Sequence, residues 1–397
     1  MASYPQRVRE LGGQAQVLIA MQFAVNASTF TSFPLTSVML ANAGHSGVLI
    51  GTVLTVILVT AKGLPLVSGH LIDQIGARLF LSGGLFLRAA GFLALAFAQD
   101  ATAVVVAAAM IGTGSAAYET AAYGELARRP TRDRKFLFLV NNQALNLGVI
   151  LGPALGALLL VFDIRTTFLA SAGLFCFGAL VARMAIRTSP PSREGARIAW
   201  AQPLIGVFRD RRFVLLCVLT TPWWIVFAQL YTSFPLYWLS LTGEVDRAQD
   251  IFIANGIAGL VFSLALLRLI DRVGEIELIL GSYAVLGLLF VAAPWLTVPA
   301  AFVVFVVVYT GAETVLLTAS DTETANIARK GAEATYFGAS QIAWIVGGTI
   351  GNFVGAMPAD GLAFATLWIA MVAVCGLGIL ASLVYWAAAR ACAVPRI

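Results

Sequence analysis

Twelve long apolar runs separated by short polar loops are the feature of this sequence that most restricts its fold. A chain inside a bilayer must satisfy its backbone N–H and C=O groups internally, so repeated crossings are made by α-helices of about 20 mostly apolar residues. The sequence therefore predicts an all-α integral membrane protein with 12 transmembrane helices. The predicted spans cover approximately residues 17–40, 48–67, 79–98, 102–126, 136–162, 168–184, 213–239, 251–269, 278–295, 300–324, 336–357 and 362–388.

Composition excludes several other classes of protein. Of the 397 residues, 59% are hydrophobic and 11% are charged, whereas soluble domains average roughly 45–50% apolar and about 25% charged residues. The four cysteines include no CxxC pair and there are only two histidines, so we expect no metal site, disulfide framework or bound cofactor. No polar stretch is long enough for a separate extramembrane domain, so we expect any functional site to lie between helices.

The distribution of basic residues predicts the orientation. With both termini in the cytoplasm, only Arg165 and Arg247 fall in outer loops and Arg88 lies within the third span, while the other 22 of the 25 Lys and Arg residues lie at the inner face. Short cytoplasmic loops carry such an excess of positive charge. We therefore expect a multi-pass inner-membrane protein with cytoplasmic N- and C-termini. The net charge of +5 then needs no nucleic-acid partner to explain it.

The sequence repeats itself at a separation of about 200 residues, a sign of internal duplication. The letters TSFPL at 31–35 recur at 232–236, and LIDQIG at 71–76 recurs as LIDRVG at 269–274. Both pairs have the same orientation, which predicts two parallel six-span halves with a substrate site near the midplane between them. We expect an N-terminal bundle over 1–187, a cytoplasmic linker over 188–212 on the membrane surface, and a C-terminal bundle over 213–397.

The loop GHLIDQIGAR at 69–78 resembles the G-x-L-a-D-r-x-G-r-k loop of the major facilitator superfamily and lies between spans two and three, as in that family. The resemblance covers the whole chain and implies two six-helix bundles around a central cavity that work by alternating access. In this family the loop latches the inner ends of the two halves. The residues that inherit this gating role are Gly69, Asp73, Gly76 and Arg78, with Asp271 and Gly274 in the second copy.

A second resemblance concerns the direction of transport. The segment GVILGPALG at 148–156 is similar to the G-x-x-x-G-P-x-x-G-G signature of drug/proton antiporters, with Leu139 and Ala157 in place of its outlying glycines. It implies a gating role for Gly148, Gly152, Pro153 and Gly156. The alternative is a seam of small residues that allows close helix packing.

Ionisable residues inside the spans are candidates for proton coupling, since each costs roughly 2.5–3.5 kcal/mol to insert. They are Glu119, Glu313 and Asp321, together with Arg88. Burial disfavours the charged form of a carboxyl, so such a group can bind and release a proton during a cycle. The alternative is that a carboxyl pairs with Arg88 or with backbone groups and only fixes helix packing.

Amides and aromatic rings on the other helices predict the substrate site. Asn and Gln avoid spans three, six, nine and twelve, which the family resemblance makes the outer, lipid-facing helices. Aromatic faces suit bulky amphipathic or cationic molecules, although some of these residues could pack against helices or lipid instead. The candidate substrate-binding residues are Gln22, Asn26, Tyr118, Tyr123, Asn142, Asn146, Gln229, Tyr231, Asn255, Tyr309 and Gln341.

Together these features predict a monomeric secondary transporter that exports a small amphipathic molecule (a drug, siderophore or secondary metabolite) in exchange for protons. An alternative is an importer or facilitator of a small metabolite without proton antiport. An intramembrane enzyme or receptor is the third possibility. We expect no enzyme activity, because the sequence offers no nucleophile with a histidine partner, no metal-ligand cluster and no extramembrane domain. It has no ATP-binding GxxxxGK[ST] loop either, so we expect the proton gradient to supply the energy.

Overall fold

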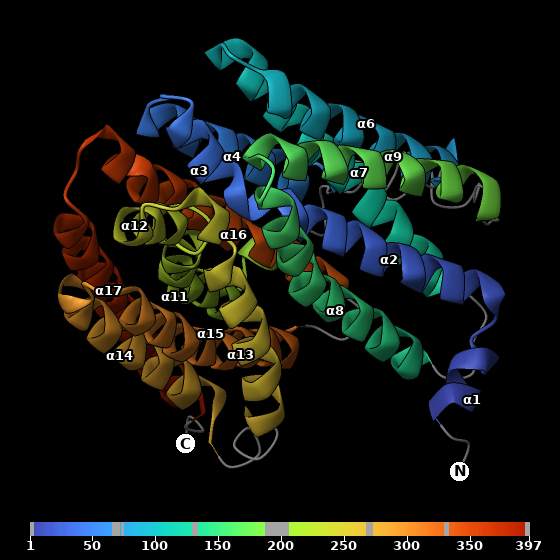
Figure 1. Ribbon diagram of the computed structural model, residues 1–397. Helices are drawn as coiled ribbons and strands as arrows, with labels where there is room; N and C mark the ends of the chain where they lie inside the picture. Colours follow the sequence, from blue (N-terminus) through green and yellow to red (C-terminus); the bar gives the residue numbers. More distant parts are fainter. Residues whose placement is uncertain are drawn as a thin grey trace. The chain divides into compact units, whose positions relative to one another are not determined.

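The computed structural model describes residues 4–65, 72, 75–128, 134–186, 206–266, 273–328 and 333–393 (Figure 1). The chain forms two compact units: unit 1 comprises Met1–His45, Val56–Ile198 and Val245–Ile253, and unit 2 comprises Ser46–Thr55, Ala199–Glu244 and Ala254–Ile397. Helices α4 (Gly47–Gly63) and α13 (Asp250–Leu266) therefore each contribute residues to both units. The domain boundaries expected from the sequence stay a prediction, and the linker lies outside the described residues as far as residue 205.

Unit 1 is built from helices that pack in neighbouring pairs, α2 with α8, α6 with α7, and α6 with α9. Its elements, besides its part of α4 and α13, are α1 (Tyr4–Glu10), α2 (Gly13–Ser32), η1 (Phe33–Leu35), α3 (Thr36–Asn42), α6 (Ala77–Phe97), α7 (Ala101–Arg128), α8 (Arg134–Leu160), α9 (Ile164–Ala185) and η3 (Val245–Arg247).

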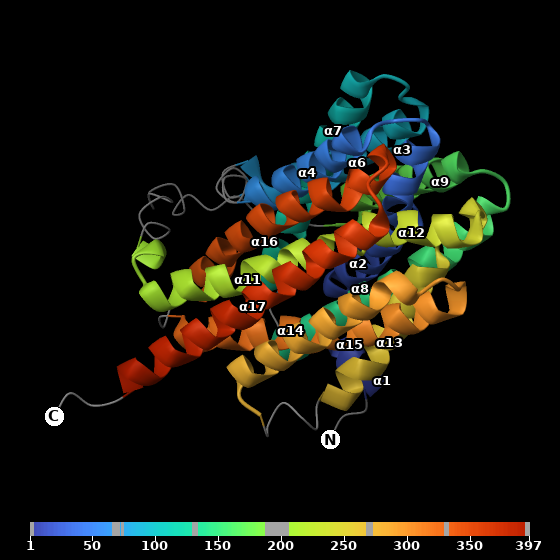
Figure 2. The same cartoon turned by 90° about the vertical axis from the view of Figure 1, so that its left-hand side faces the viewer.

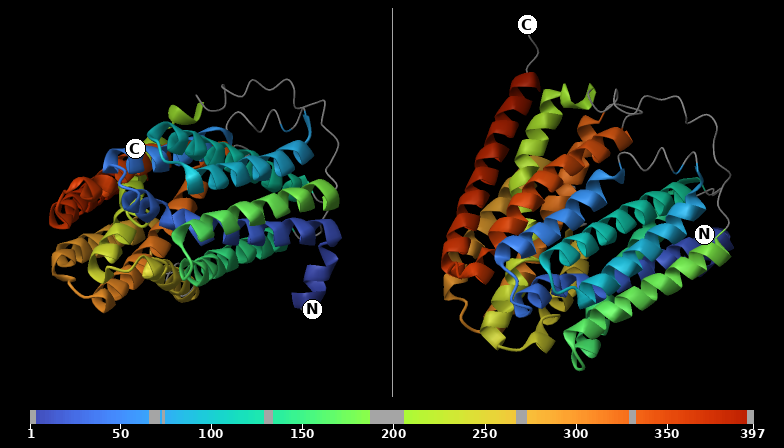
Figure 3. Two further views of the ribbon diagram at one scale, coloured as in Figure 1. Left: turned by 45° about the horizontal axis from the view of Figure 1, so that its top comes forward. Right: turned by 90° about the horizontal axis from the view of Figure 1, so that it is seen from above.

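Unit 2 repeats this pairing, with α11 lying between α16 and α17 (Figures 2 and 3). Its elements, besides its part of α4 and α13, are α11 (Arg211–Ala228), α12 (Ser233–Thr242), α14 (Glu275–Ala292), η4 (Ala293–Trp295), α15 (Pro299–Ile327), α16 (Glu333–Ala356), η5 (Met357–Asp360) and α17 (Phe364–Ala393).

The predicted all-α membrane architecture is confirmed. Within the described ranges nine helices are long and apolar enough to cross a membrane, and α4 and the start of α13 are shorter apolar helices. Large apolar side chains point outward, among them Phe86 on α6, Phe177 on α9, Leu288 on α14 and Ile369 on α17, each at least 60% exposed. Surfaces of this kind require lipid around them. These four helices are the ones predicted to be lipid-facing.

The repeated TSFPL segment marks a break in a helix in each half. The first predicted span is divided into α2, the 3-10 turn η1 and α3, and the seventh into α11 and α12. Pro34 lies in the first turn of η1, and Pro235 lies in the first turn of α12. Proline has no N–H, so it fits the first turn of a helix, whereas farther inside a helix it removes a backbone hydrogen bond. The TSFPL repeat thus marks the equivalent point in each half at which the chain restarts a helix.

Glycines spaced four residues apart allow close helix contacts in both units. A Cβ added at Gly152 of α8 would lie 2.6 Å from the carbonyl oxygen of Ala27 in α2. In unit 2 a Cβ added at Gly351 of α16 would lie 2.5 Å from the carbonyl oxygen of Ile225 in α11. The complete ridges are Gly148, Gly152 and Gly156 in α8, and Gly347, Gly351 and Gly355 in α16. Since both halves share the spacing, the ridge has a packing function irrespective of any role in gating.

Two polar clusters tie elements together inside unit 2. Asp360 of η5 accepts hydrogen bonds from the backbone N–H groups of Gly47 (2.7 Å) and Val48 (3.3 Å), so its carboxylate binds the N-terminus of α4. Elsewhere, the buried Glu323 of α15 accepts a hydrogen bond from the Tyr385 hydroxyl of α17 and lies 3.7 Å from Arg212 of α11. The Glu323 contacts satisfy a buried carboxylate that would be costly to leave unpaired, whereas Asp360 is exposed and caps a helix N-terminus.

Candidate functional site

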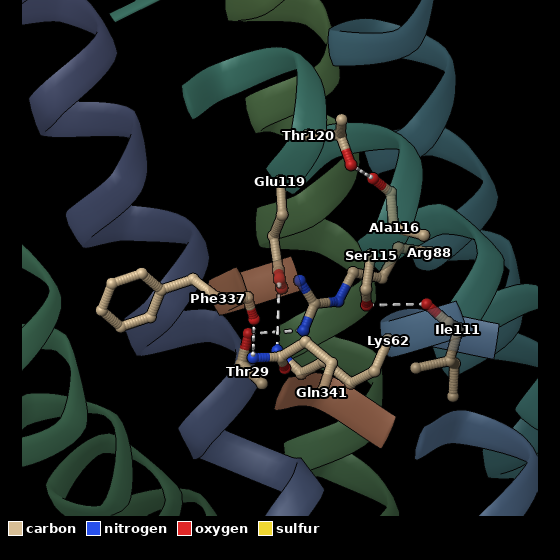
Figure 4. A network of polar contacts seen from close by, with 10 residues as sticks. All are labelled: Thr29, Lys62, Arg88, Ile111, Ser115, Ala116, Glu119, Thr120, Phe337 and Gln341. Carbon is tan, nitrogen blue, oxygen red and sulfur yellow. Dashed lines mark hydrogen bonds and ion pairs between the residues drawn. The ribbon is translucent and has the colours of Figure 1, made fainter. Parts of the chain in front are cut away.

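Glu119 lies on α7 at a point where α4 approaches very closely. Gly112, two turns earlier on the same helix, contacts α4 so tightly that a Cβ there would lie 2.6 Å from the carbonyl oxygen of Ile57 and 1.8 Å from the Thr60 hydroxyl. This approach brings the ammonium group of Lys62 to 3.8 Å from the Glu119 carboxylate (Figure 4). Gly112 and Glu119 therefore both face α4, and Lys62 is an ion-pair partner of Glu119.

Arg88 of α6 lies beside this pair. Its side chain is 95% buried, donates a hydrogen bond to the Thr29 hydroxyl of α2 (2.8 Å), and places its guanidinium 4.7 Å from the centre of the Phe175 ring. Gly84 and Gly114 let α6 and α7 touch at this level. The partners of Arg88 in these contacts are neutral, and its Nε has no hydrogen-bond partner among the described residues. Figure 4 shows Glu119 and Arg88 turned toward the same space, and Glu119 lies within electrostatic range of the guanidinium.

Lys62 is not among the site residues predicted from the sequence, because its place near the end of span two groups it with the inner-face cations. A signal was available, since Lys62 falls inside the apolar run at 48–67. Glu119 forms its ion pair with Lys62, and Arg88, the partner considered from the sequence, interacts with Glu119 through its charge. Lys62 and Glu119 keep 27% and 40% of their side-chain surface exposed, respectively. We call Lys62, Arg88 and Glu119 the unit 1 charge cluster.

Glu313 forms the corresponding polar set in unit 2. Asn255 of α13 donates hydrogen bonds to the Glu313 carboxylate (3.1 Å) and to the Thr310 hydroxyl of α15 (2.8 Å). Glu313 is half-buried. The fold therefore brings together two residues that the sequence identified separately, Asn255 as a substrate-binding candidate and Glu313 as a proton-coupling candidate. Asp321, the third predicted carboxyl, is exposed on α15 and is not part of this set.

Aromatic side chains of α11, of the turn after it and of α16 cluster within unit 2. The indole rings of Trp224 and Trp344 stack with their centres 4.4 Å apart and an angle of 10° between their planes. Phe227 packs edge-on against both indoles, and Tyr231 packs on Phe227 with ring centres 5.6 Å apart. These four side chains are half-buried, so their faces are partly covered and partly accessible. We call Trp224, Phe227, Tyr231 and Trp344 the aromatic cluster.

Several predicted substrate-binding residues pack between helices in this structure. Gln229 is fully buried, donates to the carbonyl oxygens of Ile225 and Gly351, and accepts from the Ser233 hydroxyl. Gln22, Tyr118 and Tyr309 are buried as well. The amide of Asn26 donates to the Leu145 carbonyl in α8 (2.7 Å), and that of Gln341 donates to Phe337 (3.5 Å). Tyr123 and Asn146 are exposed, and the Asn142 side chain lies outside the description. Their role in substrate binding stays a prediction.

The predicted gating loop is described only in part. Gly69, Asp73 and Asp271 lie outside the described residues. Gly76 precedes α6 with φ of 103°, a conformation that strongly favours glycine. Arg78 donates to the carbonyl oxygen of Ile186 (3.4 Å), and Gly274 precedes α14 with an ordinary φ of −67°. The first copy of the motif therefore needs its glycine for the backbone, whereas the second does not.

Comparison with known proteins identifies the family. The family model for the Major Facilitator Superfamily matches residues 18–352. The chain belongs to the major facilitator superfamily. It is similar to the multidrug resistance protein MdtH of Aeromonas salmonicida, with 27% identity over 360 residues and 88% of each chain covered. An uncharacterized MFS-type transporter of Mycobacterium tuberculosis is 29% identical over 250 residues, with 62% of this chain and 59% of that protein covered.

Solved structures share the fold at low sequence identity. The nucleoside transporter NupG matches with a TM-score of 0.77 and 15% identity, covering 94% of this chain and 98% of NupG. A peptide transporter POT in complex with sulfate matches with a TM-score of 0.72 and 15% identity, covering 98% of each chain. The predicted superfamily fold is thereby confirmed. This member of the superfamily is a multi-pass membrane transporter of small molecules.

Proposed function

We propose that this transporter exports small amphipathic molecules from the cytoplasm across the inner membrane by alternating access, in exchange for protons. The observation that carries the proposal is that each unit holds a carboxyl within a transmembrane helix beside a polar partner, Glu119 with Lys62 and Glu313 with Asn255. Such groups are costly in a membrane and mark ion pathways. Similarity to MdtH, named a multidrug resistance protein, supports export as the direction.

The aromatic cluster supports the amphipathic character of the substrate. Stacked and edge-on rings offer flat apolar faces that bind planar or cationic molecules. In the proposed cycle Glu313 or Glu119 is protonated from the outer side and loses the proton to the inner side. The protein works as a monomer with both termini in the cytoplasm, uses the proton gradient in place of a cofactor, and has no enzyme activity.

The test is transport by purified protein in liposomes whose interior is acidified, with rhodamine B as a planar amphipathic probe. Protons leaving the liposome should drive accumulation of the dye above its outside concentration, and nigericin, which collapses the gradient, should abolish it. Protein-free liposomes and the Glu313→Gln variant control for passive distribution. Equilibration without accumulation would support the facilitator alternative and contradict the proposal.

A further inference from the structure

We propose that the unit 1 charge cluster binds an anionic group, a carboxylate, of the transported molecule. The inference deepens the proposed function and rests on it for the identity of the ligand as cargo. Lys62 is the residue that contacts the ligand. Arg88 adds a second, fixed positive charge, and Glu119 is the protein's own carboxylate beside the Lys62 ammonium group.

Charged side chains from three helices meet in the unit 1 charge cluster. Lys62 and Arg88 bring two cations together, and Glu119 brings one carboxylate to them. The other contacts of the Arg88 guanidinium are with the Thr29 hydroxyl and the Phe175 ring, which are neutral, and its Nε is unpartnered among the described residues. Arg88 is buried, so its positive charge is weakly screened and adds to that of Lys62. Together the two cations favour binding of an anionic group.

Accessibility decides which side chain meets the ligand. Arg88 is 5% exposed and held by α2 and α9, so it acts through its field. Lys62 is 27% exposed, and its distance of 3.8 Å from Glu119 exceeds the 2.7–2.9 Å of a direct charge-assisted hydrogen bond. The ammonium group has three donors, so it can bind a cargo carboxylate in addition to Glu119. Lys62 is therefore the binding residue and Arg88 a positioning residue.

The same geometry assigns the proton-exchanging group. Among the described residues, the charged and titratable groups that interact with Glu119 include Lys62 on α4, Arg88 on α6, and Tyr118 and Tyr123 on α7 itself. An anion bound at Lys62 would repel the Glu119 carboxylate and favour its neutral form. By linkage, anionic cargo and a proton on Glu119 then bind cooperatively, which is the opposite of exchange. Exchange of a proton against cargo is accordingly assigned to Glu313, in unit 2.

The test compares two dyes that differ only at the carboxyl group: rhodamine B, which carries a free carboxylate, and its ethyl ester. Equilibrium binding to purified protein is measured by fluorescence polarisation without any gradient, so the result is independent of transport. Lys62→Gln should weaken rhodamine B binding at least about tenfold, the loss expected for a charged hydrogen bond, and change ester binding less than about twofold. Lys62→Arg should retain the preference for the free acid. Thermal melting of each variant reports whether it is folded.

The outcomes separate this inference from the proposed function. Wild-type protein that binds both dyes equally, or neither, overturns the carboxylate site. Equal loss of both dyes in Lys62→Gln also overturns it, because that result indicates a structural role. Glu119→Gln should tighten rhodamine B binding, whereas Glu313→Gln should lose proton-driven accumulation. If acid-inside liposomes fail to accumulate the dye although Lys62 selects the free acid in binding, the export mechanism fails and the site stands.

Discussion

Replacing Gly112 by alanine tests the packing that creates the unit 1 charge cluster. The added Cβ would lie 2.6 Å from the Ile57 carbonyl oxygen and 1.8 Å from the Thr60 hydroxyl. The hydroxyl can rotate away, but the carbonyl belongs to the backbone of α4. Because an ordinary carbon–oxygen contact is about 3.3 Å or longer, α4 must move from α7 by roughly 0.7 Å. Overpacking of this kind costs about 1–3 kcal/mol.

A matched control lies on the same helix. Gly124 of α7 has no atom within 4 Å of an added Cβ, so Gly124→Ala changes the glycine without a collision. We expect Gly112→Ala to lower the apparent melting temperature by several degrees in detergent and Gly124→Ala to leave it unchanged or raise it. The eight tryptophans of the chain supply the fluorescence signal for thermal unfolding.

Movement of α4 away from α7 in Gly112→Ala should also change ligand binding. Moving α4 outward lengthens the 3.8 Å separation of Lys62 and Glu119, so Gly112→Ala should also reduce the preference for rhodamine B over its ester, while Gly124→Ala retains it. If both variants melt alike and both keep the preference, close packing of α4 on α7 does not create the site and the reasoning is refuted.

Three further variants test other parts of the structure. Asp360→Asn removes the negative charge from the carboxylate that accepts from Gly47 N–H at 2.7 Å, so it should lower stability by about 1 kcal/mol; a melting temperature equal to wild type would contradict this. Glu323→Gln and Tyr385→Phe, combined in a double-mutant cycle of thermal stability, should show a coupling of about 0.5–3 kcal/mol, and additive losses would mean that their contact contributes nothing. Trp344→Ala removes one ring of the aromatic cluster and should weaken binding of both dyes alike; an effect on rhodamine B alone would argue against stacking.

Much of the architecture could be predicted from sequence because the bilayer restricts it so strongly. Apolar runs of fixed length become helices, and the TSFPL repeat at 31–35 and 232–236 marks the equivalent point in each half. The interruption at Pro34 was not predicted, since hydropathy does not distinguish a continuous helix from one that restarts. Glu119 and Glu313 were identified because ionisable side chains are rare and costly within apolar helices.

The partners of those carboxyls could not be predicted, because they depend on which helices approach each other. Nothing in the local sequence of Lys62 shows that Gly112, fifty residues later, lets α4 and α7 touch. Asn255 was a candidate for its amide, but its bond to Glu313 is a contact between two helices. Gln229 shows the reverse: its amide looked suited to a substrate, yet it is fully buried and bonded to neighbouring helical groups.

The ridge on α16 was missed although its signal was present. Gly347, Gly351 and Gly355 follow the same four-residue spacing as the α8 ridge, about 200 residues after it, as duplication predicts. Without a matching proline the segment did not resemble the antiporter signature. The structure shows that the spacing serves helix packing in both halves.

The central claim is that this transporter moves its substrate against protons, and the most direct test follows the protons themselves. Liposomes containing the purified protein and a trapped pH-sensitive dye are given rhodamine B outside, with an acidic interior. We predict that substrate entry is accompanied by proton exit, that the internal pH rises only when substrate is present, and that Glu313→Gln abolishes the change. Substrate entry with no change in internal pH, or with movement of protons in the same direction, would contradict proton-coupled export.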